Sequence, residues 1–364
     1  MRVVAYTDSA GIGGAEISLG HLVATASPTI DLTVVGVSQT VVDAIADRRP
    51  QAARWVLPAG EVLAHWFRFQ RLRPDIIHLN LCTPWAGAIG LAAAIATPGA
   101  RVVRVDQLPL RTTDALHLWR TRALSLRVDA HVAVGEASAR RMEDFYALGR
   151  RSVRSIPNGV PDEGGGTESA AESRPGTLVV GSVGRLDAMK AHDVLLRAMA
   201  QVDDVHLIIL GDGAERQSLE TLATDLGVRD RLELPGWVSN PRRYLPQFDA
   251  VALPSRSEGF PLAMVEAMLA ARPVVATRVG SMPEAIIHGE TGLLIEKDDV
   301  AGLANALRCL RDDRSLRLRL GRQARERAIA HYTVEAMMKG YEQLWSSLLM
   351  APRAPRLRIP RPRD

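Results

Sequence analysis

The chain has 364 residues, of which 47% are hydrophobic and 24% are charged. This length suits two domains, and so much apolar material excludes a disordered or fibrous protein. The formal net charge is only +4, which does not favour a nucleic-acid-binding protein.

Residues 1–160 contain short β-branched runs separated by longer stretches with helical spacing. The runs are RVVAYT, LTVVGV, DIIHLN, RVVRVD and AHVAVG. They show little polar alternation, which is typical of parallel strands covered on both faces. The first run has no signal-peptide pattern, and the uncharged stretch 79–100 is broken by Pro84 and Pro98. We therefore expect a soluble protein without a membrane span.

A linker and a second domain follow. Residues 161–176 have no apolar periodicity and are rich in Gly, Ser and Glu, which predicts a flexible inter-domain loop. Residues 177–330 repeat the alternation with TLVVGSVG, VHLIILGDG, RLELPG, DAVALPS, PVVATRVG and TGLLIE. Right-handed crossovers make each half doubly wound. The prediction is an α/β protein with two Rossmann-like domains facing across a cleft.

The C-terminal end has two parts. Residues 331–350 have apolar residues at helical spacing, which predicts a terminal helix. Residues 351–364 are Pro-rich without periodicity, so we expect a disordered tail. Its five arginines against one aspartate account for the whole net charge. The tail is either a solubilising end or an arm for acidic lipid or another anionic partner.

The loop after the first strand is the first candidate site. Gly11, Gly13 and Gly14 lead into a helix that starts near Ala15, so the backbone can approach a phosphate or a sugar. The dinucleotide fingerprint fails because Glu16 replaces its third glycine, which argues against a dehydrogenase. The loop is therefore either a tight turn or a ligand loop.

Two cations follow the first strand of the second domain. Arg185 and Lys190 lie in GRLDAMK, at the carboxyl end of TLVVGSV, where ligands of parallel sheets bind. They are either a surface pair or the ligands of a pyrophosphate, for which Arg offers a planar fork and Lys a point charge.

The strongest motif is SEGFPLAMVEAM, at a predicted strand-to-helix turn. Glu258 precedes the helix and Glu266 lies in its second turn. They are either two surface glutamates or ligands of sugar and ribose hydroxyls beside a helix-start phosphate site. The backbone N–H groups that converge there belong to Gly259, Phe260 and Leu262, since Pro261 has none.

At these residues the sequence resembles a known family. The two glutamates match the E-x7-E signature of family-4 retaining glycosyltransferases, which have the GT-B fold. The resemblance covers nearly the whole chain. Its other segments are GGAE (13–16), PDIIHLN with His78, IPNGV (156–160), GRLDAMKAHD, LGDG (210–213), LPGWV (234–238) and GSMPEAIIHGETGLLI.

The resemblance implies a role for each matching residue. Domain 1–160 would bind the acceptor, domain 177–330 would bind the nucleotide sugar, and helix 331–350 would cross back to the first domain. Glu266 would bind the ribose, Glu258 the donor sugar, and the backbone of Trp237 and Val238 the base. The remaining donor contacts would come from Gly13, Gly14, Gly211, Gly259, Phe260, Pro261 and Leu262.

Three departures lie on the acceptor side. Asp106 stands near the position where many relatives have a His, Gly135 where they often have Ser, and Pro161 where Asp is usual. Asp106 is therefore the candidate base. The other predicted catalytic groups, Arg185, Lys190 and Glu258, face the leaving diphosphate and the sugar.

The predicted reaction is transfer from a nucleotide-diphosphate sugar, with UDP the best guess, to an acceptor hydroxyl on a glycan, a lipid-linked intermediate or a small molecule. Without an evident nucleophile, same-face attack with retention is expected. No Asp-x-Asp occurs, so we expect neither a metal nor another cofactor. The alternative is a catalytically inactive nucleotide-sugar-binding subunit that scaffolds a pathway.

The remaining residues indicate compartment and packing. Two cysteines, Cys82 and Cys309, suit a reducing cytoplasm, and the basic tail is a candidate for contact with the inner face of the membrane. His78, His131 and His192 are interpreted as core residues, because they lie in or beside buried strands and show no metal-ligand spacing.

Overall fold

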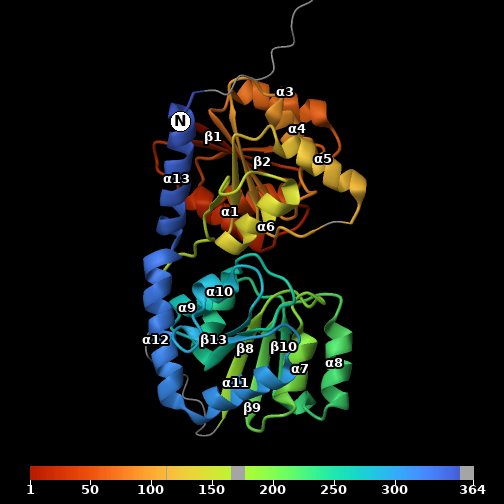
Figure 1. Cartoon of the computed structure of the whole chain (residues 1–364), viewed down its shortest axis with the longest axis vertical. Helices are drawn as coiled ribbons and strands as arrows, with labels where there is room; N and C mark the ends of the chain where they lie inside the picture. Colours follow the sequence, from red (N-terminus) through yellow and green to blue (C-terminus); the bar gives the residue numbers. More distant parts are fainter. Residues whose placement is uncertain (112, 165–176, 353–364) are drawn as a thin grey trace, which may run out of the picture.

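The computed structural model describes residues 1–111, 113–164 and 177–352. Most of the predicted linker and nearly all of the predicted tail therefore lie outside the described residues. The described chain forms two α/β lobes stacked along the long axis of the molecule (Figure 1). Each lobe is built on one parallel sheet with helices on both faces, which is the two-Rossmann GT-B arrangement predicted from the sequence.

The first lobe has a seven-stranded sheet in the order β3-β2-β1-β4-β5-β6-β7. Four of its strands are fully or nearly fully buried, as the apolar runs predict. The sequence prediction missed β3 and β7, two short strands at the sheet edges, and every residue of β3 is exposed. The strands are β1 (Arg2–Thr7), β2 (Asp31–Gly36), β3 (Ala53–Val56), β4 (Ile76–Leu81), β5 (Arg101–Asp106), β6 (Ala130–Ala133) and β7 (Val153–Ser155). The helices are α1 (Gly14–Thr25), α2 (Gln39–Ala46), α3 (Val62–Leu72), α4 (Ala88–Ile95), α5 (Ala115–Ser125) and α6 (Glu136–Tyr146).

The second lobe has a six-stranded sheet in the order β10-β9-β8-β11-β12-β13. All six predicted runs form strands. They are β8 (Leu178–Val183), β9 (Val205–Leu210), β10 (Leu232–Gly236), β11 (Ala250–Leu253), β12 (Val274–Thr277) and β13 (Gly292–Ile295). The helical elements are α7 (His192–Met199), α8 (Arg216–Asp225), η1 (Arg229–Arg231), η2 (Pro241–Gln247), α9 (Leu262–Leu269), α10 (Met282–Ala285), α11 (Val300–Asp312) and α12 (Arg314–His331).

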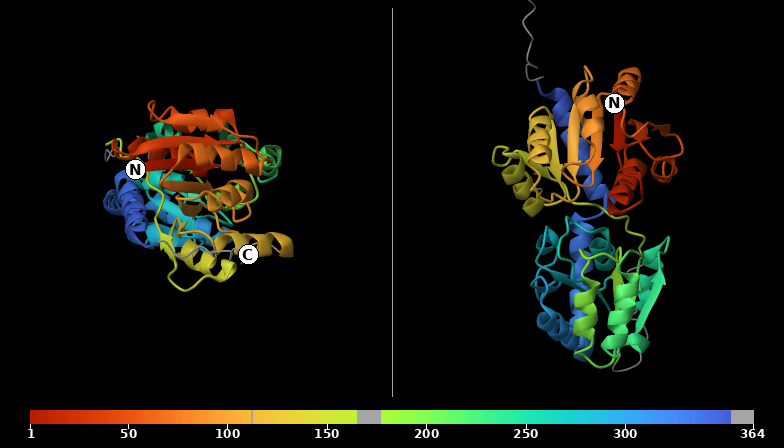
Figure 2. Two further views of the ribbon diagram at one scale, coloured as in Figure 1. Left: turned by 90° about the horizontal axis from the view of Figure 1, so that it is seen from above. Right: turned by 90° about the vertical axis from the view of Figure 1, so that its right-hand side faces the viewer.

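The last helix, α13 (Val334–Met350), leaves the second lobe and packs along the first, as the right-hand view of Figure 2 shows. Met337, Met338, Tyr341, Leu344 and Trp345 are buried in the core of the first lobe. Burial of these side chains stabilises the packed position of the helix, by about 1.5–3 kcal/mol for each large side chain.

The chain crosses between the lobes twice, and the two crossings are hydrogen-bonded to each other. The Val160 N–H donates to the Tyr332 carbonyl at 3.0 Å, and the Val334 N–H donates to the Val160 carbonyl at 3.2 Å. The Thr333 side chain caps α13 by accepting from the Ala336 N–H. This paired crossing joins the lobes at one side.

Candidate active site

The carboxyl ends of three strands of the second sheet bring the predicted donor residues together. The loop after β8 carries Arg185 and Lys190, the loop after β9 carries Gly211, and the loop after β11 carries Glu258. Gly211 has φ +143, and a Cβ there would overlap with the Gly184 carbonyl. Only glycine therefore allows the β9 loop to pack against the loop that holds Arg185.

Lys190 and Glu258 form a close ion pair at this edge. The Lys190 Nζ lies 2.5 Å from the Glu258 Oε1, and the Ser255 hydroxyl donates to the same oxygen at 2.8 Å. The Lys190 and Glu258 side chains are only 21% and 10% exposed, so solvent screens the pair weakly. Each charge holds the other in one position, ready to contact a polar ligand.

Arg185 has more freedom than Lys190. Its side chain is 72% exposed and contacts Asp187 at 3.2 Å. Across the interface lie Asp8 and Glu16 of the first lobe, and all three charges act on the pKa of Cys82. Burial raises the pKa of Cys82 most, the two carboxylates raise it further, and Arg185 lowers it. The Arg185 charge is therefore close enough to Cys82 of the first lobe to act on its pKa.

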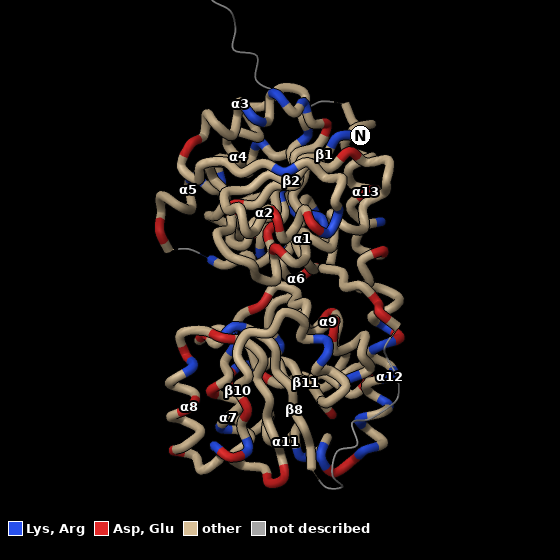
Figure 3. Tube along the Cα trace, turned by 180° about the vertical axis from the view of Figure 1, so that it is seen from behind, with Lys and Arg blue, Asp and Glu red and all other residues tan. Residues whose placement is uncertain are grey.

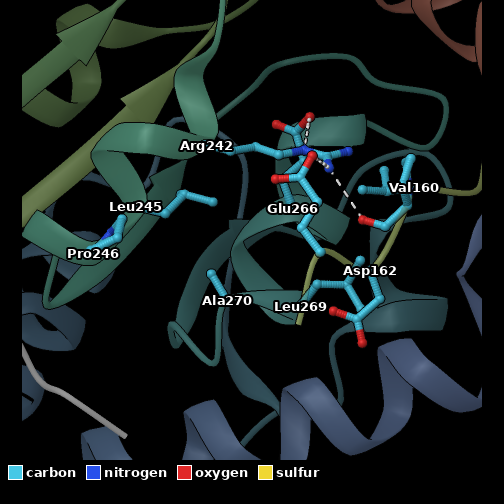
Figure 4. A pocket seen from close by; sticks show the side chains of 10 residues that line it. Val160, Asp162, Arg242, Leu245, Pro246, Glu266, Leu269 and Ala270 are labelled. Atoms are coloured by element: carbon cyan, nitrogen blue, oxygen red, sulfur yellow. Dashed lines mark hydrogen bonds and ion pairs between the residues drawn. The ribbon is translucent and has the colours of Figure 1, made fainter. Parts of the chain in front are cut away.

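Glu266 lies within α9 and contacts Arg242, a residue that the sequence reasoning missed. The Nε of Arg242 lies 3.4 Å from the Glu266 Oε1 (Figure 4). The Nη1 of Arg242 donates to the Pro161 carbonyl and to the Glu163 carboxylate. Burial raises the pKa of Glu266, and the charge of Arg242 opposes this shift. No local sequence signal links Arg242 to Glu266, because they are 24 residues apart and in different elements.

A cavity of about 120 Å³ opens beside this ion pair, between the linker, η2 and α9. A carboxylate at its edge provides the hydrogen-bond acceptors that ribose hydroxyls need. The lining residues are Val160, Pro161, Asp162, Glu163, Arg242, Leu245, Pro246, Glu266, Leu269 and Ala270.

The segment before α9 is held between the lobes. A Cβ at Gly259 would overlap with the Gln107 carbonyl of the first lobe. The Asn158 Nδ2 donates to the Phe260 carbonyl at 3.0 Å and to the Gln107 Oε1 at 2.9 Å. Pro261 is the N-cap of α9 and Leu262 its first residue. Gly259 is thus required by inter-lobe packing, a role that the sequence reasoning did not give it.

The two remaining predicted donor segments lie at the edges of this region. Trp237, which directly follows β10, is 72% exposed. Val238 is partly buried and packs against the hydrophobic core around α9 in the second lobe. In the first lobe, the Gly13 N–H donates to the Glu16 Oε2 at 2.9 Å, so the Glu16 side chain reaches back to the backbone at the start of α1. A Cβ at Gly14 would meet nothing within 4 Å, so this backbone is open to a ligand.

The structure corrects the prediction that Asp106 is a base. Its carboxylate is fully buried, accepts from the Arg104 Nε at 3.0 Å and contacts the Tyr146 hydroxyl. Arg104 is also buried and donates to Pro84, Ser125 and Tyr146. A carboxylate that compensates a buried guanidinium cannot reach an acceptor hydroxyl. The sequence around Asp106 could not reveal that its carboxylate is buried, because Tyr146, which contacts it, comes from α6.

The departure at Gly135 also has a structural reason. Glu284 of the second lobe caps the first turn of α6, accepting from the N–H groups of Glu136 and Ala137 at 2.8 Å each. A Cβ at Gly135 would overlap with the Ser281 side chain that lies beside this cap. A residue without a side chain therefore permits the lobes to meet here.

The three histidines are core residues, as predicted. His78, His131 and His192 are each at most 6% exposed. His78 packs edge-on against Tyr341 and Trp345, and its ring nitrogens have no hydrogen-bond partner among the described residues. Burial lowers its pKa to about 3, so the ring is neutral.

Comparisons with known proteins match both lobes. Residues 13–163 match the domain described as Glycosyltransferase Family 4, and residues 168–327 match Glycosyl transferases group 1. The lipopolysaccharide core biosynthesis glycosyltransferase LpsE of Rhizobium meliloti is 36% identical over 169 residues, which are 46% of this chain and 50% of that protein. The D-inositol 3-phosphate glycosyltransferase of Nocardia farcinica is 32% identical over 246 residues, covering 60% of this chain and 53% of that protein. The chain thus spans about half the length of these curated relatives.

A solved structure agrees with the fold. Anabaena HepE in complex with UDP-glucose superposes with a TM-score of 0.82 at 22% identity, covering 95% of this chain and 100% of that one. At this identity the likeness concerns the fold alone. Taken with the two domain matches and the paired lobes described above, these comparisons show that the chain belongs to the family-4 glycosyltransferases.

Proposed function

We propose that this protein transfers a sugar from a nucleotide-diphosphate sugar to an acceptor hydroxyl, with retention of configuration. The observation that carries the proposal is the grouping of Arg185, Lys190 and Glu258 at one sheet edge, beside the start of α9. Two cations suit a diphosphate, and a carboxylate fixed by Lys190 and Ser255 suits sugar hydroxyls.

The proposed chemistry follows from where charge develops. Breaking the sugar–phosphate bond places negative charge on the diphosphate, and Arg185 is the cation with the freedom to follow it. Lys190 and Glu258 form an ion pair, so their charges offset each other when both are buried. The pair can therefore contact the phosphate through Lys190 and the sugar through Glu258. Prepositioned groups of this kind stabilise a transition state by several kcal/mol.

Proton transfer is proposed to need no enzymic base. With Asp106 buried against Arg104, same-face attack in which the leaving phosphate oxygen takes the acceptor's proton is the route that the remaining groups favour. We propose that Arg185 and Lys190, rather than a metal, offset the diphosphate charge, since the sequence has no Asp-x-Asp for a bridging ion.

We infer that the donor is a UDP-sugar and that the acceptor is a saccharide or a lipid-linked sugar. HepE has been solved with UDP and with UDP-glucose, and LpsE is named for lipopolysaccharide core biosynthesis. The free cysteines Cys82 and Cys309 support a reducing compartment, for which we propose the cytoplasm.

The test has two stages. In a thermal-shift panel of UDP-, GDP-, ADP- and TDP-glucose, UDP-glucose at about 100 times its Kd should raise stability by about 2.7 kcal/mol. Glu258→Ala should then abolish sugar transfer or donor hydrolysis, whereas Glu233→Ala, at an exposed position on β10, should not. NMR of the product anomer tests retention, and turnover in EDTA tests the metal.

The possible outcomes separate the two candidate functions. If no nucleotide sugar shifts the melting temperature, the proposed function is wrong. If UDP-glucose binds but no turnover occurs with any saccharide acceptor, and Glu258→Ala changes nothing, the inactive binding subunit is supported instead.

A further inference from the structure

Arg256 lies two residues before Glu258, in the turn that follows β11. Its Nη1 donates to the Ala188 carbonyl at 2.7 Å, and its Nη1 and Nη2 donate to the two carboxylate oxygens of Asp193 at 3.0 and 2.8 Å. Its Nε donates to the Asp298 carboxylate at 2.6 Å. This side chain thus joins the loop after β8, the first turn of α7 and the loop after β13.

The backbone of Arg256 is bound to the same loop after β8. Its N–H donates to the Met189 carbonyl at 2.7 Å. Within the loop, the Asp187 carboxylate accepts from the N–H groups of Met189 and Lys190 at 3.1 and 3.2 Å. Arg256 therefore holds the carbonyls of both residues that come directly before Lys190.

The residue that follows Lys190 has a backbone conformation that needs support from its surroundings. Ala191 is the N-cap of α7 and has φ 54 and ψ 40, in the left-handed region that residues with a Cβ rarely adopt. Such conformations persist where the surrounding contacts leave no alternative. The bonds from Arg256 to Ala188 and to Asp193, one on each side of Ala191 in the chain, provide this constraint.

The ion pairs of Arg256 are too exposed to contribute much to stability. The side chains of Arg256, Asp193 and Asp298 are 31%, 36% and 45% exposed, so water screens their charges. Lys/Arg and Asp/Glu positions both occur along the edge of the second lobe that faces the first lobe (Figure 3). Arg256 is distinguished by its partners, which lie on both sides of Lys190 in the chain and in a third segment.

We propose that Arg256 is a positioning residue for sugar transfer, which holds Lys190 against Glu258 and within reach of the donor diphosphate. It acts through the backbone of residues 187–191 and does not itself bind the donor. This role rests on the proposed function, in which Lys190 offsets the charge of the diphosphate. Because that charge grows in the transition state, a displaced Lys190 should lower kcat more than it lowers the affinity for the donor.

Kinetics of sugar transfer or donor hydrolysis with UDP-glucose test this role. Arg256→Gln should lower kcat about 100-fold, the loss expected for a displacement of about 1 Å, with a smaller change in the affinity for UDP. Arg256→Lys keeps the charge but cannot form the paired hydrogen bonds to Asp193. It should lower kcat less, and it provides a second variant if Arg256→Gln does not fold.

Arg311→Gln is the matched control. Arg311 also donates to one carbonyl, that of Asp203 at 2.9 Å, and to one carboxylate, that of Asp312 at 2.8 Å. Its side chain is 22% exposed. Asp203 comes before β9, at the amino edge of the second sheet, whereas ligands of parallel sheets bind at the carboxyl edge. This variant should therefore keep the wild-type kcat and affinity for UDP.

Two further variants distinguish positioning from a general loss of stability. If Arg256 acts through Lys190, the double variant Arg256→Gln/Lys190→Ala should be no slower than Lys190→Ala, whereas independent losses would multiply. Ala191→Gly removes the Cβ that makes the left-handed conformation unfavourable. Added to Arg256→Gln, it should therefore raise kcat about fivefold.

Lysine acylation reports the position of Lys190 without any activity. The sequence has lysine only at positions 190, 297 and 339, so mass spectrometry can follow each of them. In the wild-type protein the ion pair with Glu258 should make Lys190 react more slowly than the exposed Lys339. In Arg256→Gln the reactivity of Lys190 relative to Lys339 should rise several-fold, and in Arg311→Gln it should not change.

The outcomes separate this role from the proposed function. Unchanged reactivity of Lys190 in folded Arg256→Gln, multiplied losses in the double variant, or an equal loss of kcat in Arg311→Gln would each overturn the role of Arg256. A wild-type protein that neither binds nor turns over any nucleotide sugar would refute the proposed function instead. The acylation result would then still decide whether Arg256 holds Lys190 in place.

Discussion

Replacing Glu266 by Gln gives the sharpest test of the donor site. The Glu266 side chain is 11% exposed, touches Arg242, and borders the cavity beside the linker. If its carboxylate accepts hydrogen bonds from ribose hydroxyls, the neutral amide loses one charged acceptor. A hydrogen bond to a charged group contributes about 1.5–3 kcal/mol, so UDP should bind roughly 10- to 100-fold more weakly.

Calorimetric titration with UDP and 2′,3′-dideoxy-UDP measures this effect directly. Wild-type protein should prefer UDP, and Glu266→Gln should lose most of that preference because the two ribose hydroxyls no longer meet a carboxylate. Burial raises the pKa of Glu266 above the ordinary carboxylate value of 4.5. As the pH is lowered, Glu266 should therefore become protonated, and the affinity for UDP should fall, before the pH reaches 4.5. In Glu266→Gln this pH dependence should disappear.

Glu163→Gln is the matched control for this variant. Glu163 contacts Arg242 at 2.8 Å, like Glu266, but its side chain is 66% exposed. Its substitution disturbs the same arginine without removing the proposed ribose acceptor. If Glu266→Gln kept the wild-type preference for UDP over the dideoxy nucleotide, or if Glu163→Gln lost it equally, the assignment of Glu266 to ribose would be refuted.

Three further predictions follow from the packing. Gly211→Ala should lower the melting temperature and prevent the UDP-glucose shift, because its Cβ overlaps with the Gly184 carbonyl, whereas Gly227→Ala, where a Cβ meets nothing, should cost about 1 kcal/mol and keep the shift. Glu284→Ala removes two hydrogen bonds between the lobes, so small-angle scattering should show a larger radius of gyration, and an unchanged radius would contradict this cap. Stability should be greatest above pH 6.5 and fall towards pH 4, because buried histidines that are neutral in the fold become charged on unfolding, at up to about 1.4 kcal/mol per pH unit for each. Urea titrations at pH 7 and pH 5 check this, with His78→Phe reducing the difference. The histidines with lowered pKa are His21, His131 and His192, each at about 4, and His78 at about 3.

Most of the fold could be predicted from the sequence. Strands covered on both faces must be apolar throughout, so runs such as DIIHLN and VHLIIL stand out against the amphipathic helices between them. β3 could not be recognised in this way, since an exposed edge strand such as ARWV lacks that pattern. The packing of α13 on the first lobe was expected from the family resemblance alone, because an apolar helix face by itself fits either core.

The site residues also differ in whether their roles depend on local sequence or on tertiary contacts. Glu258, Glu266 and the start of α9 lie in one strand-turn-helix segment, so their chemistry is readable from twelve consecutive letters. Contacts between distant segments are not: Arg242 reaches Glu266 from η2, and Glu284 caps a helix of the other lobe. Asp106 is the clearest case, because its neighbours in sequence leave open whether it faces a ligand or the core. Only the tertiary structure decided this, by burying Arg104 beside it and so requiring its negative charge inside the first lobe.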